Sequence, residues 1–237
     1  MKFRKDNMVT SSLDGYQNRR RDKVDIFAIF YNNKNEEQAK PMAKYMRNKF
    51  PFLGLKKPER AALSKEFVNS KIKVTEIDWD FIFKCYDMPE REFQYLAIDY
   101  MDKVKKIFTP DDMKNIEKLL ITKSWWDSVD AINKTVGYIA MKYPEVKEDV
   151  LLKWIESENI WLNRVSIIFQ LKYKEKTDTE FLSKAILHNS QTEEFFINKA
   201  IGWALRQYSK TNREWVKNFI QQNPLQPLSV KEGSKYL

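Results

Sequence analysis

The chain has few of the residues that make turns: 5 glycines and 8 prolines among 237 residues. Sandwiches and barrels need a turn after every short strand, and few short runs alternate between apolar and polar residues. An all-β fold is therefore disfavoured. Long apolar runs are also missing, and none approaches the roughly 20 residues that a membrane-spanning helix requires. We expect no membrane association.

Cysteine and histidine are nearly absent. The single cysteine, Cys85, cannot form an internal disulfide, and its apolar surroundings in residues 81–86 are typical of a buried small side chain rather than a reactive thiol. The single histidine, His188, falls at a predicted helix end and more plausibly supports that terminus than acts as a base. We find no cluster with metal-ligand spacing, no phosphate-binding loop and no nucleophile elbow. We therefore expect no metal and no cofactor.

What the chain does contain is positive charge. Lysine and arginine total 42 against 33 acidic residues, which gives a net charge of +9. A basic balance favours polyanionic partners, nucleic acid first. The only tight basic run is residues 19–21, so we expect a flexible basic segment over residues 1–20 and one domain over 21–237. The N-terminus has no apolar core of a secretory signal, and we expect a cytoplasmic protein.

Helical patterns follow one another along the whole domain. Proline with an acidic neighbour marks several expected first turns, as at Pro58, Pro89 and Pro144, where the missing N–H costs nothing. The expected connections are only a few residues long, so consecutive helices should pack antiparallel. The predicted helices span residues 22–32, 35–50, 58–69, 75–87, 89–107, 110–122, 125–142, 145–156, 159–173, 178–188, 191–209 and 211–222.

An internal repeat organises these helices. Aromatic residues recur at Phe93, Trp126, Trp161 and Phe196, with separations of 33, 35 and 35 residues. This period suits one helix pair per repeat, the unit of an α-solenoid. Every second helix then lines one face of a curved stack, and a concave basic face of that kind suits an elongated partner such as duplex DNA.

The repeat exposes one carboxylate that does not fit the pattern. Four positions after the aromatic residue, three of the repeats carry alanine or valine. The repeat that contains Trp126 carries Asp130 at this position instead. Aspartate is a poor helix former, so its presence inside a helix needs an explanation. Asp130 shares a helix face with Trp126, while Arg164 and Trp203 fall at nearby phases of the next two repeats. These four residues are the candidate catalytic site.

Two structural explanations compete with catalysis. Ser124 and Asp127 have capping-box spacing, which accounts for Asp127. Asp130 itself has Lys134 four residues later, and an ion pair between them is at least as plausible as a catalytic role. A carboxylate beside indole faces also suits a reaction that develops positive charge, such as cleavage of an N-glycosidic bond.

Several long segments in a fixed order resemble the AlkD-type DNA glycosylases, bacterial repair proteins built of HEAT-like helical repeats. The resemblance covers about residues 35 to 230. The segments that carry it are Pro41–Met46, Leu53–Leu55 with Pro58–Arg60, Pro89–Gln94, Lys123–Asp130, Asn159–Arg164 and Glu194–Arg206.

The resemblance implies a monofunctional enzyme of the bacterial cytoplasm that removes N3- and N7-alkylated purines, such as 3-methyladenine and 7-methylguanine, from duplex DNA. It implies Asp130 as the catalytic carboxylate, Trp126 and Trp203 as aromatic walls, and Arg164 as a phosphate or site-organising contact. It also implies an all-α solenoid of HEAT-like antiparallel helix pairs with a basic concave face, acting as a monomer. We expect DNA contacts from Tyr45, Lys57, Arg60, Lys123, Ser124, Phe196, Lys199 and Arg206.

Two alternatives from other functional classes stay open at this point. One is a non-catalytic HEAT-like module that binds DNA, with the same steep salt dependence. A carboxylate facing a groove lined by phosphates argues against it, because that charge repels DNA unless it has a role there. The other is a protein–protein scaffold, which the excess positive charge disfavours.

Overall fold

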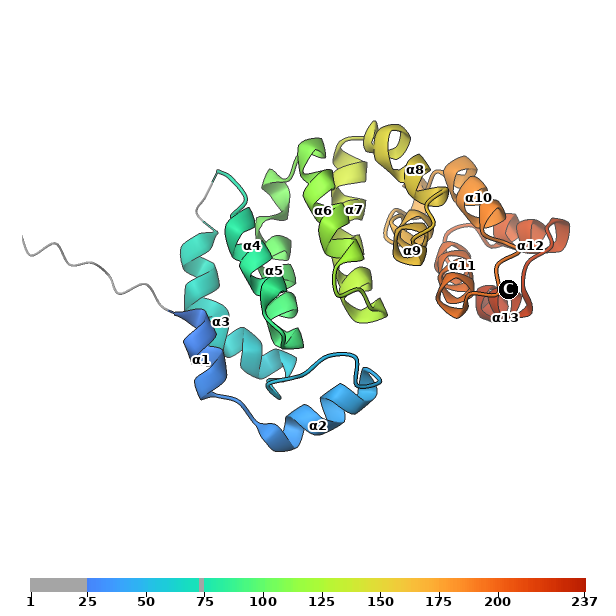
Figure 1. Cartoon of the computed structure of the whole chain (residues 1–237). Coiled ribbons are helices and arrows are strands. Elements are labelled where there is room, and N and C mark those ends of the chain that lie inside the picture. Colours follow the sequence, from blue (N-terminus) through green and yellow to red (C-terminus); the bar gives the residue numbers. More distant parts are fainter. Residues whose placement is uncertain (1–24, 73–74) are drawn as a thin grey trace, which may run out of the picture.

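The computed structural model describes residues 25–72 and 75–237, and every regular element within them is helical. The helices form a curved stack (Figure 1). The predicted N-terminal segment, residues 1–20, lies outside the described residues. The α-helices are α1 (Ile26–Asn32), α2 (Glu36–Tyr45), α3 (Lys57–Lys71), α4 (Trp79–Asp87), α5 (Arg91–Val104), α6 (Met113–Ile121), α7 (Trp126–Lys142), α8 (Leu152–Ile155), α9 (Ile160–Ile168), α10 (Thr179–His188), α11 (Phe195–Tyr208), α12 (Arg213–Gln222) and α13 (Pro227–Gly233).

Short helical turns connect some of these helices. They are η1 (Lys105–Ile107), η2 (Pro110–Asp112), the π-helical η3 (Lys147–Leu151), η4 (Lys174–Lys176) and η5 (Ser234–Tyr236). None of the helices in the described residues is both long and apolar enough to cross a membrane.

The packing follows the predicted repeat. Helices α4, α6 and α8 each contact the helix that follows them, and α5, α7, α9 and α11 contact one another in succession. The four aromatic residues of the repeat lie in the first turn of these last four helices. Figure 1 shows α9 and α11 on the inner side of the arc and α8 and α10 on its outer side. The all-α solenoid expected from the sequence is therefore confirmed.

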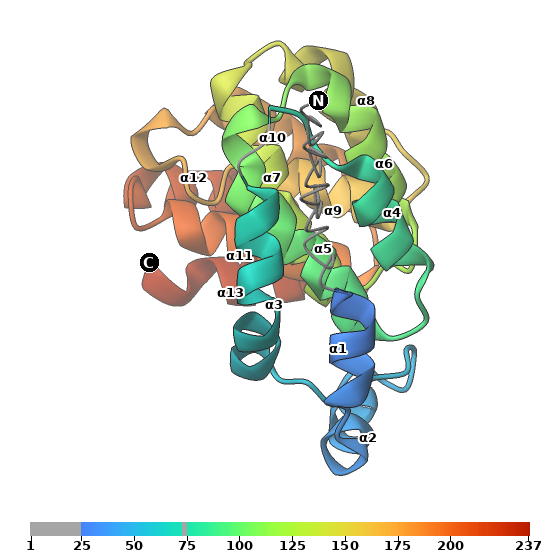
Figure 2. The same cartoon turned by 90° about the vertical axis from the view of Figure 1, so that its left-hand side faces the viewer.

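Helix boundaries differ from the prediction where the backbone leaves the helical region. The helix predicted over residues 35–50 ends at Tyr45, because Arg47 and Asn48 adopt positive φ angles of 55° and 54°. The segment that follows returns through Gly54, at φ 89°, where a Cβ would lie 2.0 Å from the Asn35 carbonyl oxygen. This excursion places α2 apart from the stack at the N-terminal end of the arc (Figures 1 and 2).

Caps explain where several helices start. Thr109 begins η2 with a capping box, in which the Thr109 N–H donates to Asp112 at 2.8 Å. The capping box predicted for Ser124 and Asp127 is wrong. The N-cap of α7 is Trp125, and the Ser124 hydroxyl donates instead to the Leu120 carbonyl at 2.6 Å.

Helices α7 and α9 approach closely at a glycine. A Cβ on Gly137 would lie 2.4 Å from the carbonyl oxygen of Phe169. The Tyr173 hydroxyl donates to the Gly137 carbonyl at 2.6 Å, and the Asn133 amide donates to the Ile168 carbonyl at 3.1 Å. The missing side chain at Gly137 thus sets the distance between the two helices that carry the candidate site.

We expect the substitution Gly137→Ala to destabilise the protein, because the new methyl group would press against backbone that cannot rotate away. Overpacking of this kind costs about 1–3 kcal/mol, whereas helix propensity alone would favour alanine by about 1 kcal/mol. Urea unfolding of the variant and of the exposed control Lys142→Ala measures the difference. A more stable Gly137→Ala variant would contradict the close approach of α7 and α9.

Candidate active site

Asp130 lies on α7, and the side chain of Arg164 from α9 holds it. Arg164 Nε and Nη2 donate to the two carboxylate oxygens at 2.7 and 2.8 Å, and Nη1 donates to the carbonyl of Phe196 on α11 at 2.6 Å. This planar, two-point contact balances the charge of the carboxylate and also fixes its position and orientation. The alternative prediction, an ion pair between Asp130 and Lys134, is wrong, because Arg164 is the partner.

A second carboxylate on α7 is held in the same manner from the other side. Arg91 of α5 donates from Nε and Nη2 to Asp127 at 3.0 and 2.8 Å, and from Nη1 to the carbonyl of Lys123 at 2.7 Å. The hydroxyl of Tyr95 donates to the same carboxylate at 2.5 Å. Burial, followed by the charge of Asp127, raises the pKa of Tyr95, so the hydroxyl keeps its proton.

Exposure and free lone pairs distinguish the two carboxylates. The Asp127 side chain is 7% exposed and accepts three hydrogen bonds, while Asp130 is 19% exposed and accepts two, both from Arg164. A carboxylate offers about four acceptor positions, so Asp130 retains capacity for a ligand. Asp130 is therefore accessible to a ligand, whereas Asp127 ties α7 to α5.

The Asp130 side chain lines a cavity of about 360 Å³ that lies between α7, the segment after α9, and α11. Trp203 and Tyr138 line the same cavity, and so do the basic residues Lys134 and Lys172. A volume of that order is typical of a small-ligand site. Arg164 stands behind the carboxylate, since its own side chain is only 6% exposed.

Trp126 lines a neighbouring cavity of about 440 Å³ rather than the one that holds Trp203. The two cavities share Asp102 and Lys134 as wall residues. The ring of Tyr45 meets the ring of Trp126 edge-on, with centroids 5.9 Å apart. The two predicted tryptophan walls thus belong to adjoining hollows on either side of α7.

The residues predicted to contact DNA divide into exposed and internally bonded groups. Tyr45 is 70% exposed, and Lys57 is exposed at the start of α3 and lines the cavity of Trp126. Both are open to a ligand. Phe196 is half-buried, with its ring against Trp125 and Trp161, and the Ser124 hydroxyl donates to the Leu120 carbonyl near the end of α6. Their contacts with DNA stay predictions.

Two predicted cations are bonded inside the protein. Arg60 is 5% exposed, pairs with Asp99 at 3.0 Å and lies over the Tyr95 ring. The Lys123 ammonium donates to the carbonyls of Tyr86, in the last turn of α4, and of Met88, just after that helix, and burial lowers the pKa of Lys123. Both side chains therefore stabilise the packing of successive helices. Their contacts with DNA stay predictions.

The remaining two predicted cations converge on one carboxylate of α13. Lys199 and Arg206 of α11 lie 3.0 and 2.6 Å from the Glu232 oxygens, and Lys235 joins them at 2.7 Å. Hydrogen bonds from Lys235 and then Lys199 hold the pKa of Glu232 at about 2. The sequence prediction ended its last helix at residue 222 and missed both α13 and this cluster.

The sequence analysis also missed several wall residues of the two cavities. The sequence pattern presents Lys134 only as a partner of Asp130, and it does not single out Asp102, Tyr138 or Lys172, which line the same cavity. One signal could have identified Lys134, namely its position eight residues after Trp126 and four after Asp130 on one helix face. The same spacing reaches Tyr138, four residues after Lys134, whereas Asp102 and Lys172 lie on other segments that the sequence pattern does not join to α7.

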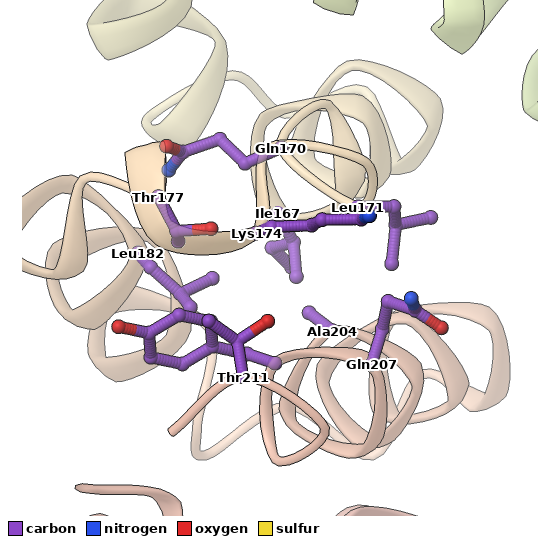
Figure 3. A pocket seen from close by; sticks show the side chains of 10 residues that line it. Ile167, Gln170, Leu171, Lys174, Thr177, Leu182, Ala204, Gln207 and Thr211 are labelled. Carbon is purple, nitrogen blue, oxygen red and sulfur yellow. The ribbon is translucent and has the colours of Figure 1, made fainter.

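Another cavity is too small for a nucleotide. It measures about 20 Å³ and lies between the end of α9, α10 and α11, where Figure 3 shows Gln170, Thr177 and Gln207 around it. Space of this size accommodates about one water molecule. Within residues 25–72 and 75–237, no group of three or more histidine, cysteine, aspartate or glutamate side chains could hold a metal ion.

Comparison with known proteins agrees with the resemblance seen in the sequence. A family model described as DNA alkylation repair enzyme matches residues 27–237. A solved structure, described as a predicted DNA alkylation repair enzyme from Enterococcus faecalis, is 40% identical and superposes with a TM-score of 0.82 over 86% of this chain and 96% of that chain. No curated protein matches. The chain therefore belongs to the DNA alkylation repair enzymes, whose substrate is DNA.

Proposed function

We propose that the protein is a monofunctional DNA glycosylase that excises N3- and N7-alkylated purines from duplex DNA by hydrolysing the N-glycosidic bond. The observation that carries this proposal is the Asp130 carboxylate, held by Arg164 at the wall of an open cavity. The proposed enzyme acts as a monomer in the bacterial cytoplasm. Its reaction needs neither a metal nor a cofactor, because the substrate already carries the charge that drives it.

In DNA, an alkylated purine such as 7-methylguanine carries a positive charge while it is bound to its sugar, and this charge makes the base a good leaving group. When its bond to C1′ of the deoxyribose breaks, the bonding electron pair goes to the base, which leaves neutral, and positive charge develops on the sugar. The Asp130 carboxylate stabilises that charge electrostatically. A water molecule then forms the new bond at C1′, and its proton passes to Asp130 or to solvent.

Arg164 acts as a positioning residue in this scheme. Its three nitrogens bond to Asp130 and to the Phe196 carbonyl, so the carboxylate is fixed relative to both α9 and α11. Preorganised charge is effective because it does not have to reorient as the reaction proceeds. The indole face of Trp203, in the same cavity, attracts a cation, which favours the charged lesion and the developing sugar cation.

The first test is Asp130→Asn, which keeps the shape of the side chain and removes its charge. We expect release of 7-methylguanine from methylated duplex DNA to fall by at least about 100-fold, with binding of the duplex retained. Single-turnover assays that quantify free base, together with a gel-shift measurement of affinity, give both values.

The matched control is Asp102→Asn, which makes the same change to an exposed carboxylate of the same cavity. We expect it to keep base release and to bind DNA at least as tightly. Equal losses in the two variants would show that charge in the groove, rather than Asp130, governs the reaction. Tight DNA binding without base release by the wild-type protein would replace the glycosylase with a non-catalytic DNA-binding module.

The second test is Arg164→Lys, which keeps a positive charge next to Asp130 but loses the planar two-point contact. We expect base release to fall by about 100-fold, since small displacements of a catalytic group have effects of that size. Duplex affinity should change little, because Arg164 is buried behind Asp130. Loss of binding with an unchanged rate of release at saturation would instead make Arg164 a phosphate contact.

A further inference from the structure

Lys134 lies at the junction of the two cavities. It follows Trp126 and Asp130 on one stripe of α7, at intervals of four residues, and it lines both hollows. The Trp126 cavity is on one side of it, and the Asp130 and Trp203 cavity is on the other. A DNA strand that occupies both cavities passes over the side chain of Lys134.

Like Lys57 and Lys172, which each line one of the two cavities, Lys134 has no ionic partner among the described residues, and of these three lysines it alone lines both cavities. It is exposed, and it forms no ion pair with any residue in the described ranges 25–72 and 75–237. Arg60, Lys199 and Arg206 are paired with carboxylates, and Lys123 is bonded to backbone carbonyls. Of the five cations that the sequence favoured for DNA contacts, these four are thus bonded within the protein, and Lys57 stays exposed.

The charges that face Lys134 leave its own charge uncompensated. Asp130 is paired with Arg164, and Asp102, the other residue shared by the cavities, is paired with Lys105 at 3.1 Å. Each of these pairs is close to neutral as a unit. The wall between the two hollows therefore carries the net positive charge of Lys134, which suits a phosphodiester, the anionic group that links neighbouring nucleotides.

We propose that Lys134 is a positioning residue that binds the phosphate flanking the damaged nucleotide and so places its deoxyribose against Asp130. This rests on the proposed glycosylase function. Four residues, an axial rise of about 6 Å, separate Lys134 from Asp130. The ammonium therefore holds the backbone while the carboxylate faces the adjoining sugar.

The test compares Lys134→Gln with Lys134→Arg and with Lys153→Gln, a matched loss of charge at an exposed position of the outer helix α8. The ligand is a duplex with one 7-methylguanine whose 2′-fluoro sugar resists cleavage. We expect Lys134→Gln to bind about tenfold more weakly and to lower the slope of log affinity against log salt by about 1. Lys134→Arg should restore both values, and Lys153→Gln should leave them unchanged.

Single methylphosphonate substitutions identify the phosphate. When the contacted phosphate is made neutral, Lys134→Gln should cause no further loss of affinity, while at other positions the two losses should add. Additive losses at both phosphates flanking the lesion would overturn the proposal, as would wild-type affinity of Lys134→Gln. Thermal unfolding should be unchanged in Lys134→Gln, since the side chain is exposed and unpaired.

Base release from the same duplex with an ordinary deoxyribose separates the two proposals. A contact that positions the sugar predicts slower release by Lys134→Gln even at saturating protein, and an unchanged rate there would overturn the positioning role. Failure of the wild-type protein to release base would sink the glycosylase. The phosphate contact would still be decided by the binding data, which need no cleavage.

Discussion

The structure depends on bidentate contacts between arginine and aspartate across successive helices of the stack. In a solenoid, each repeat contacts only its neighbours, so the register between adjacent helices is set locally. Arg91 joins α5 to Asp127 on α7, and Arg164 joins α9 to Asp130 on the same helix. Helix α7 is thereby held from both sides. Its position in the arc is fixed by these charged, directional hydrogen bonds as well as by apolar packing.

The same two contacts produce very different sites. Around Asp127, Tyr95 supplies a third donor and the surroundings are closed, so the carboxylate serves the packing of the helices. Around Asp130, no third donor is present among the described residues, and the carboxylate faces a cavity. A small difference in local contacts thus separates a structural carboxylate from one available to substrate, although both have the same partner type.

Internal pairing also determines which cations remain for DNA. A basic chain of net charge +9 has many lysines and arginines, but those bonded to Asp99 and Glu232 stabilise helix packing first. Positive charge at the wall of the cavities comes instead from residues such as Lys57, Lys134 and Lys172, which are exposed. The placement of free charge, rather than its total, is what an approaching phosphate encounters.

The sequence by itself determined the all-helical fold, the repeat of about 35 residues and the departure of Asp130 from its pattern. These features follow from local periodicity, which each segment carries alone. Only the tertiary structure decided that Arg164 rather than Lys134 pairs with Asp130, that Trp126 and Trp203 line separate cavities, and that α13 brings Glu232 to Lys199 and Arg206. Those outcomes depend on the distance and orientation between helices that the sequence keeps apart, and contacts such as the close approach of Gly137 to Phe169 appear in no single segment.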